Sequence, residues 1–229
     1  MLFTLIAIGC IENGLYPIVD ANNEFEESTE WTPFPQNTHS EDDTGIWGPY
    51  DVLVVLDTSG SMRDDTLIHF GISQIPYELN SHASSWQLRL ITADAEETAL
   101  WEVLPTNTDP EWAVMEGISY LLSTNAIREE GIDAALAYQA DNSSWFRPGV
   151  TTLLVLVSDE DDQSEVDPST LLSTWTNPLQ IVTVVGLEEA DRNPDKDPNY
   201  MCGADAGTRY LQIATRSVDI CTTTRWSVF

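Results

Sequence analysis

The sequence predicts an α/β protein with a doubly wound, mostly parallel central sheet and helices on both faces. Short apolar runs rich in β-branched residues alternate with stretches of helical spacing along the chain. This alternation is typical of parallel strands joined by crossover helices. Two of the runs, which end at Asp57 and Asp159, are apolar almost throughout, as expected for strands covered on both faces. A length of 229 residues allows one domain with a tail.

The first half of the domain is predicted to hold three strands. Residues 51–57 (DVLVVLD) form a β-branched run followed by turn residues, which predicts a strand. Residues 63–80 carry Leu and Ile at helical spacing, and we expect Pro76 to shorten or kink that helix. Residues 86–94 (WQLRLITAD) and 98–104 (TALWEVL) predict two further strands.

The second half continues the same alternation. Residues 151–159 (TTLLVLVSD) predict a buried strand, and 179–187 (LQIVTVVGL) predict another. Helical spacing covers residues 110–122, 129–140, 168–174 and 208–215, and a short strand is expected around 218–221. The series contains no internal repeat. We place the domain at residues 50–229, and the residues near Trp226 and Phe229 suggest the start of a further helix, so we expect truncation at both ends.

The first ten residues, MLFTLIAIGC, form a short apolar run that ends on a small residue before Cys10. The run resembles the bacterial lipoprotein lipobox, although no basic residue precedes it. The resemblance implies export, lipidation of Cys10, and anchoring in the bacterial cell envelope, periplasmic or surface-exposed. An unprocessed apolar tail or a strand is the alternative.

Residues 11–49 contain no Lys or Arg and are rich in Asp, Glu, Asn, Thr and Pro. Such a stretch cannot bury enough apolar surface to offset its ordering entropy, so we expect a disordered acidic tether. Its aromatic residues Trp31, Phe34 and Trp47 can still dock on the domain, Trp47 most readily. Over the whole chain, 9 basic against 38 acidic residues give a net charge of −29. This charge repels polyphosphate and excludes a nucleic-acid partner, and no apolar run reaches the roughly 18–20 residues of a membrane-spanning helix.

Oxygen-bearing side chains follow two of the predicted strands. Asp57 ends the first, Asp159 ends the strand about one hundred residues later, and Ser59, Gly60 and Ser61 form a tight turn after Asp57. The carboxyl ends of parallel strands meet at a switch point, so we expect these groups to converge there. An oxygen-only cluster suits a hard cation such as Mg²⁺, which keeps open positions that a partner's carboxylate can fill. The alternative is a turn in which Ser or Asp caps the next helix.

The sequence DTSGSM after an apolar strand resembles the Asp-x-Ser-x-Ser signature of von Willebrand factor type A (vWA) domains, which defines their metal-ion-dependent adhesion site. The resemblance extends from Tyr50 to the end of the chain. It implies that Asp57, Ser59 and Ser61 are metal ligands, that Asp159 joins them, and that the ion is Mg²⁺, Mn²⁺ or Ca²⁺. The family also supplies a Thr from an intervening loop. Here the candidates for that position are Thr124, Glu129 and Glu130.

An acidic residue at that third position would strengthen cation retention and repel an incoming carboxylate. With the lipobox, the resemblance implies an exported, lipid-anchored binding module, not an enzyme, that holds a protein ligand through an acidic side chain. A Mg²⁺-dependent phosphohydrolase-like enzyme is one alternative, although Ser59 stands where such an enzyme has its second Asp. A metal-independent envelope scaffold is the other. Neither a Gly-x-Ser-x-Gly motif nor a phosphate-binding loop is present.

The remaining chemically active residues have simpler interpretations. If the chain is exported, Cys202 and Cys221 are expected to form a disulfide. The acidic loop at 191–199 lacks the glycine and glutamate of a calcium-binding loop, so we expect a solvated loop. His39, His69 and His82 are scattered, without catalytic partners. The run of acidic residues after Asp159 is assigned to a solvated or helix-start charge cluster outside the metal's ligands, namely Glu160, Asp161 and Asp162.

Overall fold

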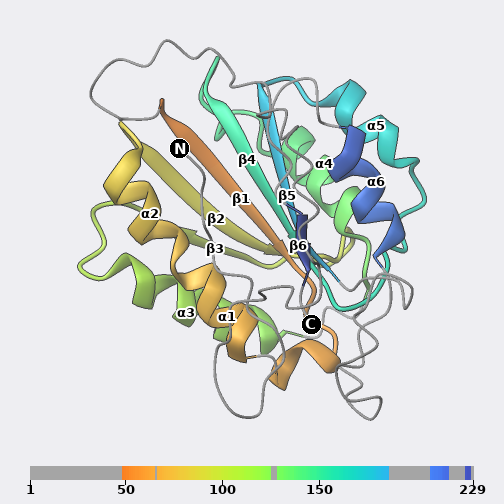
Figure 1. Ribbon diagram of the computed structural model, residues 1–229, viewed down its shortest axis with the longest axis horizontal. Helices are drawn as coiled ribbons and strands as arrows, with labels where there is room; N and C mark the ends of the chain where they lie inside the picture. Colours follow the sequence, from red (N-terminus) through yellow and green to blue (C-terminus); the bar gives the residue numbers. More distant parts are fainter. Residues whose placement is uncertain (1–47, 65, 125–127, 186–206, 217–224, 228–229) are drawn as a thin grey trace, which may run out of the picture.

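The computed structural model describes residues 48–64, 66–124, 128–185, 207–216 and 225–227. They form a six-stranded sheet in the order β3-β2-β1-β4-β5-β6 (Figure 1). The strands are β1 (Tyr50–Leu56), β2 (Trp86–Thr92), β3 (Leu100–Val103), β4 (Thr151–Val157), β5 (Leu179–Val185) and β6 (Arg225–Ser227). Every neighbouring pair is parallel except β2 with β3. The predicted α/β, mostly parallel architecture is confirmed.

Helices cover both faces of the sheet (Figure 1). One face carries α1 (Thr66–Ser73), α2 (Ile75–His82) and α3 (Pro110–Leu122); the other carries α4 (Gly131–Asp141), α5 (Pro168–Thr174) and α6 (Thr208–Arg216). Strand β1 feeds both cores, because Val52, Val54 and Leu56 pack in the first cluster and Leu53 and Val55 in the second. All five side chains are at most 1% exposed, which explains why this strand is a continuous apolar run.

Strand β3 is the antiparallel member of this mostly parallel sheet. It pairs antiparallel with β2, with Leu100 opposite Ile91 and Val103 opposite Leu88. The connection over residues 93–99 is too short for a crossover helix, which needs roughly a dozen residues or more. The chain turns back instead, and the carboxylate of Asp94 stabilises the turn by accepting the backbone N–H groups of Glu96 and Glu97, each at 3.0 Å.

The expected helix over 63–80 is divided. A 3-10 turn covers Ser61–Asp64, α1 ends at Ser73, and α2 begins at Ile75 with Pro76 in its first turn. Proline has no N–H and its ring clashes with the carbonyl four residues earlier, so it is tolerated where a helix begins and not in its interior. The predicted effect of Pro76 is confirmed, and the helical segment extends two residues further, to His82.

Several predictions concern residues outside the described ranges: the segment with Cys10, the acidic tether up to Trp47, the strand around 218–221, the loop at 191–199, and the pair Cys202 and Cys221. At the other end of the chain, the expectation of a new helix near Trp226 is wrong, because Arg225–Ser227 is strand β6 beside β5. Within the described residues, no helix has the length and apolar character needed to cross a membrane.

Candidate cation site

The site lies where the two central strands end. Leu56 pairs with Val157, and the Asp57 N–H donates to the Val157 carbonyl at 2.9 Å. After β1 the chain turns toward α1 on one face, and after β4 it turns toward α5 on the other (Figure 1). Such a divergence of neighbouring connections defines a switch point, where open α/β sheets bind their ligands.

Asp57 is the buried anchor of the site. Its side chain is fully enclosed, and both of its oxygens accept hydrogen bonds, Oδ1 from the Ser59 N–H at 2.7 Å and Oδ2 from the Ser158 hydroxyl at 2.8 Å. Burial raises the pKa of Asp57, the negative charge of Glu160 raises it further, and these hydrogen bonds oppose the shift. The carboxyl group is therefore held in one orientation, and none of the ion pairs between described residues includes it.

Two serine hydroxyls connect the first loop to the second. The oxygens of Ser59 and Ser61 lie 2.9 Å apart, and the Ser61 hydroxyl donates to Oδ1 of Asp159 at 3.1 Å. Ser61 is exposed, so this row of oxygens faces solvent. Burial raises the pKa of Asp159, and the nearby Asp57 charge contributes to the rise. The predicted convergence of Asp57, Ser59, Ser61 and Asp159 at one edge of the sheet is what the structure shows.

Glu129 lies close enough to Asp57 and Glu160 for their charges to act on it. It is 6% exposed, and Gln163 holds it twice, through its N–H to the Glu129 carbonyl at 2.7 Å and through its side-chain amide to Oε2 at 2.6 Å. The pKa of Glu129 is raised to about 8 by burial first, then by a hydrogen bond with the Glu160 carboxyl and by the charges of Asp57 and Glu160. In the cation-free protein Glu129 therefore keeps its proton at neutral pH.

The other two candidates for the third position have different partners. The Thr124 hydroxyl donates to the Leu121 carbonyl at 2.6 Å, at the end of α3. Glu130 precedes α4, and its side chain lies 3.3 Å from Arg128. Of the contacts described for Thr124, none reaches the serines or aspartates of the site. Glu129 is thus the residue of the three that the structure brings toward Asp57.

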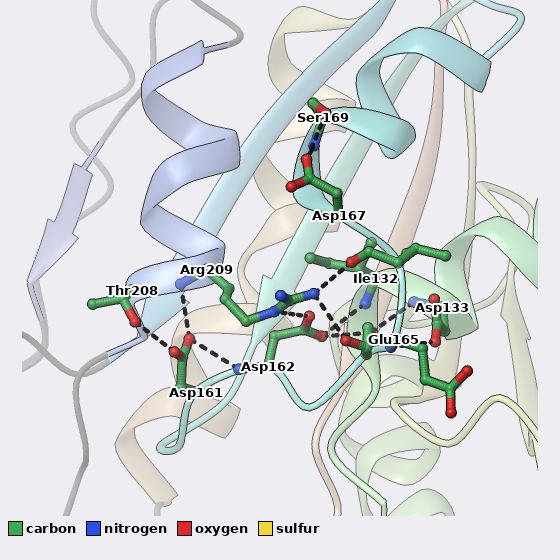
Figure 2. Close-up of polar contacts among 11 residues, drawn as sticks. Ile132, Asp133, Asp161, Asp162, Glu165, Asp167, Ser169, Thr208 and Arg209 are labelled. Carbon is green, nitrogen blue, oxygen red and sulfur yellow. Dashed lines mark hydrogen bonds and ion pairs between the residues drawn. The ribbon is translucent and has the colours of Figure 1, made fainter.

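Two residues of the acidic run after Asp159, Asp161 and Asp162, cap helices. Asp161 and Asp162 accept backbone N–H groups at the starts of α6 and α4 (Figure 2), so the helix-start interpretation holds for both and the solvated-loop interpretation does not. Sequence reasoning missed Ser158 and Gln163, which orient Asp57 and Glu129. Ser158 was detectable as a hydroxyl directly before Asp159 at a strand end, whereas nothing local marked Gln163.

The donor set is suited to a hard cation. All of its atoms are carboxylate or hydroxyl oxygens, the ligands preferred by Mg²⁺ and Ca²⁺. In the described part of the chain, no three or more His, Cys, Asp or Glu side chains are arranged to hold a metal ion. A cation placed here would have the serine hydroxyls beside the carboxylates as oxygen donors. Fold and site together define a doubly wound α/β domain with a cluster of carboxylate and hydroxyl oxygens at its switch point.

No family model matches the chain, and no curated protein is significantly similar to it. Solved structures with partial similarity include proximal thread matrix protein 1 from the mussel byssus, with a TM-score of 0.40 and 14% identity over 59% of this chain and 36% of that one. A von Willebrand factor type A protein from Catenulispora acidiphila gives 0.39 and 13% over 59% and 33%. The ArnB paralog VWA2 from Sulfolobus acidocaldarius gives 0.39 and 14% over 61% and 34%. The chain thus spans about a third of the length of these structures.

Proposed function

We propose that residues 50–229 are a vWA-type binding module that uses a divalent cation at the carboxyl ends of β1 and β4 to contact a protein ligand. The observation that carries this proposal is the continuous row of oxygens from Ser59 through Ser61 to Asp159, beside the buried carboxylate of Asp57. Two loops about one hundred residues apart in sequence place these oxygens side by side. A helix cap alone requires just one of them.

The electrostatics of these carboxylates support a cation. Asp57, Asp159 and Glu129 each have a raised pKa because burial and neighbouring negative charge disfavour ionisation. Buried carboxylates in this situation bind a proton, pair with a positive group or coordinate a metal. A bound Mg²⁺, Mn²⁺ or Ca²⁺ would supply two positive charges and a coordination position for an oxygen of the ligand.

The residues proposed to hold the ion are Asp57, Ser59, Ser61, Asp159 and Glu129, with Ser158 and Gln163 orienting them. The solvent-facing serines leave the site open on one side, where we propose that an acidic side chain of the ligand approaches. The proposal also includes export to the bacterial cell envelope, a lipid anchor on Cys10 and a Cys202–Cys221 disulfide. Their support is the sequence of the first ten residues and the even cysteine pair.

The test is a calorimetric titration with Mg²⁺ and with Mn²⁺. Asp57→Asn keeps the shape of the side chain and removes its charge, and it should abolish binding. Asp109→Asn is the matched control: it also removes one negative charge, from the N-cap of α3, and Asn is an equally good cap. It should leave binding unchanged. Absence of binding in the wild type, or equal binding by Asp57→Asn, would contradict the proposal.

The two alternative functions give distinct outcomes. A phosphohydrolase would release phosphate from a generic phosphate ester and lose that activity in Asp57→Asn. A metal-independent scaffold would retain its protein ligand in EDTA and in the Asp57→Asn variant. The binding module predicts no phosphate release and loss of the ligand under both conditions.

A further inference from the structure

Arg209 links the last described helix to the loop after β4. Its Nε lies 3.0 Å from Oδ2 of Asp162, and its Nη2 donates to the carbonyls of Ser164 at 2.9 Å and Val166 at 2.5 Å (Figure 2). The Asp162 side chain is fully buried and that of Arg209 is 29% exposed. A planar guanidinium that engages a carboxylate and two carbonyls fixes the path of a loop more firmly than a single ion pair would.

Asp162 also caps a helix that does not follow it in sequence. Its Oδ1 accepts the Ile132 N–H at 3.1 Å, at the start of α4, where the N-cap residue Glu130 makes no capping bond of its own. Ser164 adds a second cap by accepting the Asp133 N–H at 2.9 Å while donating to Asp162 at 2.8 Å. The unpaired N–H groups at the start of α4 are thus satisfied by the loop after β4.

The neighbouring Asp161 does the same for α6. Its Oδ1 accepts the Arg209 N–H at 2.8 Å, and its Oδ2 accepts the Thr208 hydroxyl. Two consecutive aspartates therefore cap two different helices (Figure 2). Tyr210 adds to the connection, because its hydroxyl hydrogen-bonds the Gly131 N–H at the start of α4. The loop after β4, α4 and α6 form one hydrogen-bonded unit.

This unit is connected to two of the proposed cation ligands, Asp159 and Glu129. Asp159 lies three residues before Asp162 on the same loop. Gln163, the residue after Asp162, holds Glu129 by both its backbone and its side chain. Arg209 does not contact any of the proposed ligands in the described structure. The loop that it fixes, however, includes the ligand Asp159 and hydrogen-bonds the ligand Glu129 through Gln163.

We infer that Arg209 and Asp162 are positioning residues of the cation site, which hold the Asp159 and Glu129 segments at the separation that a cation needs. This inference rests on the proposed function. Residues that orient metal ligands without touching the metal commonly change its affinity by about 10- to 100-fold. The pair is thus expected to set cation affinity from a helix about fifty residues away in sequence.

The chain provides a matched control at the opposite, N-terminal ends of the strands. Arg147 pairs with the fully buried Asp51 at 2.6 Å and donates to the Tyr50 carbonyl at 2.6 Å, and its side chain is 34% exposed. This pair resembles Arg209–Asp162 in chemistry and burial. It lies at the start of β1, about 20 Å from the end of that strand for a rise of roughly 3.3 Å per residue.

The experiment measures Mn²⁺ affinity by calorimetry, and the bound Mn²⁺ by its electron paramagnetic resonance signal, at a temperature where every variant is folded. Arg209→Gln should bind Mn²⁺ about tenfold more weakly than the wild type, or weaker still. Arg147→Gln should remain within about twofold of the wild type, because distant sites act independently. Both substitutions break an ion pair with a buried aspartate. A difference in Mn²⁺ affinity between the two variants would therefore reflect the positioning role of Arg209.

Arg209→Lys provides a second variant in case Arg209→Gln does not fold. Lysine keeps the charge and loses the planar fork, so its Mn²⁺ affinity should lie between those of Arg209→Gln and the wild type. Equal affinity in the wild type and Arg209→Lys or Arg209→Gln would overturn the inference, as would equal losses in Arg209→Gln and Arg147→Gln. A wild type that binds no Mn²⁺ would instead overturn the proposed function, and the inference with it.

Discussion

Individual acidic side chains give this site its chemistry. Asp57 is fully enclosed and accepts two hydrogen bonds, whereas Glu129 is nearly enclosed and shares a hydrogen bond with the Glu160 carboxyl. The hydrogen bonds hold the Asp57 carboxyl in one orientation and oppose the rise in its pKa that burial causes, while Glu129 retains a proton. Loss of that proton and arrival of a cation are therefore expected to be coupled.

Glu129 predicts how the stability of the cation-free protein depends on pH. Its pKa is about 8 in the folded protein against an ordinary value of 4.5, so the folded state binds more protons than the unfolded state between those values. The contribution of Glu129 to the free energy of unfolding is complete below about pH 4.5 and is lost as the pH rises through about 8. Thermal denaturation in EDTA should show a Tm that falls over this window.

Glu129→Gln is the variant that isolates this effect. The amide cannot ionise, so the fall in Tm between pH 5 and 8.5 should be smaller than in the wild type. Glu96→Gln is the control: Glu96 is an exposed acidic side chain that pairs with Arg128, and its replacement should leave the slope unchanged. Wild type and Glu129→Gln with the same slope would show that Glu129 ionises normally.

At the scale of single residues, much of the site was predictable. The sequence predicted that Asp57, Ser59, Ser61 and Asp159 meet, because apolar strands that end in polar residues place those residues at one edge of a parallel sheet. The choice among Thr124, Glu129 and Glu130 was not predictable. It depends on the path of the loop before α4 and on the hydrogen bond that Gln163 donates to Glu129, 34 positions earlier in the chain.

The loop after β4 caps both α4 and α6. Strand β3 forms one edge of the sheet. The alternation of strands and helices was predictable because the apolar period changes between elements. The antiparallel direction of β3 was predictable only from the length of the preceding loop, which is too short for a crossover, and not from the strand's own composition. The contacts of Arg209 with residues more than forty positions away also had no local signal.

Gly117 provides a test of how α3 packs on β3. A methyl group at this position would lie 2.4 Å from Cδ1 of Trp101, whereas one at Gly60 would meet no atom within 4 Å. Gly117→Ala should therefore lower the free energy of unfolding by about 1–3 kcal/mol through overpacking, although alanine favours helices. Gly60→Ala should change it by less than about 0.5 kcal/mol. Urea denaturation measures both, and a stabilised Gly117→Ala would contradict the described packing.

At the scale of the whole molecule, the net charge of −29 opposes compaction through self-repulsion. Added salt screens this repulsion, so NaCl alone should raise Tm. The proposed site predicts an additional, specific effect of Mg²⁺. At equal ionic strength, Mg²⁺ at one hundred times its Kd should add about 2.7 kcal/mol to the free energy of unfolding. Asp57→Asn should keep the response to NaCl and lose the additional stabilisation; equal responses of both proteins to Mg²⁺ would indicate screening alone.

In the proposed site, oxygens of separate loops surround one divalent cation at the carboxyl ends of β1 and β4. Anomalous diffraction from a crystal of the full chain grown with Mn²⁺ tests it most directly. We expect one strong anomalous peak within bonding distance of Ser59 and Ser61, close to Asp57, Asp159 and Glu129. A crystal with manganese bound elsewhere, and no peak between these side chains, would contradict it.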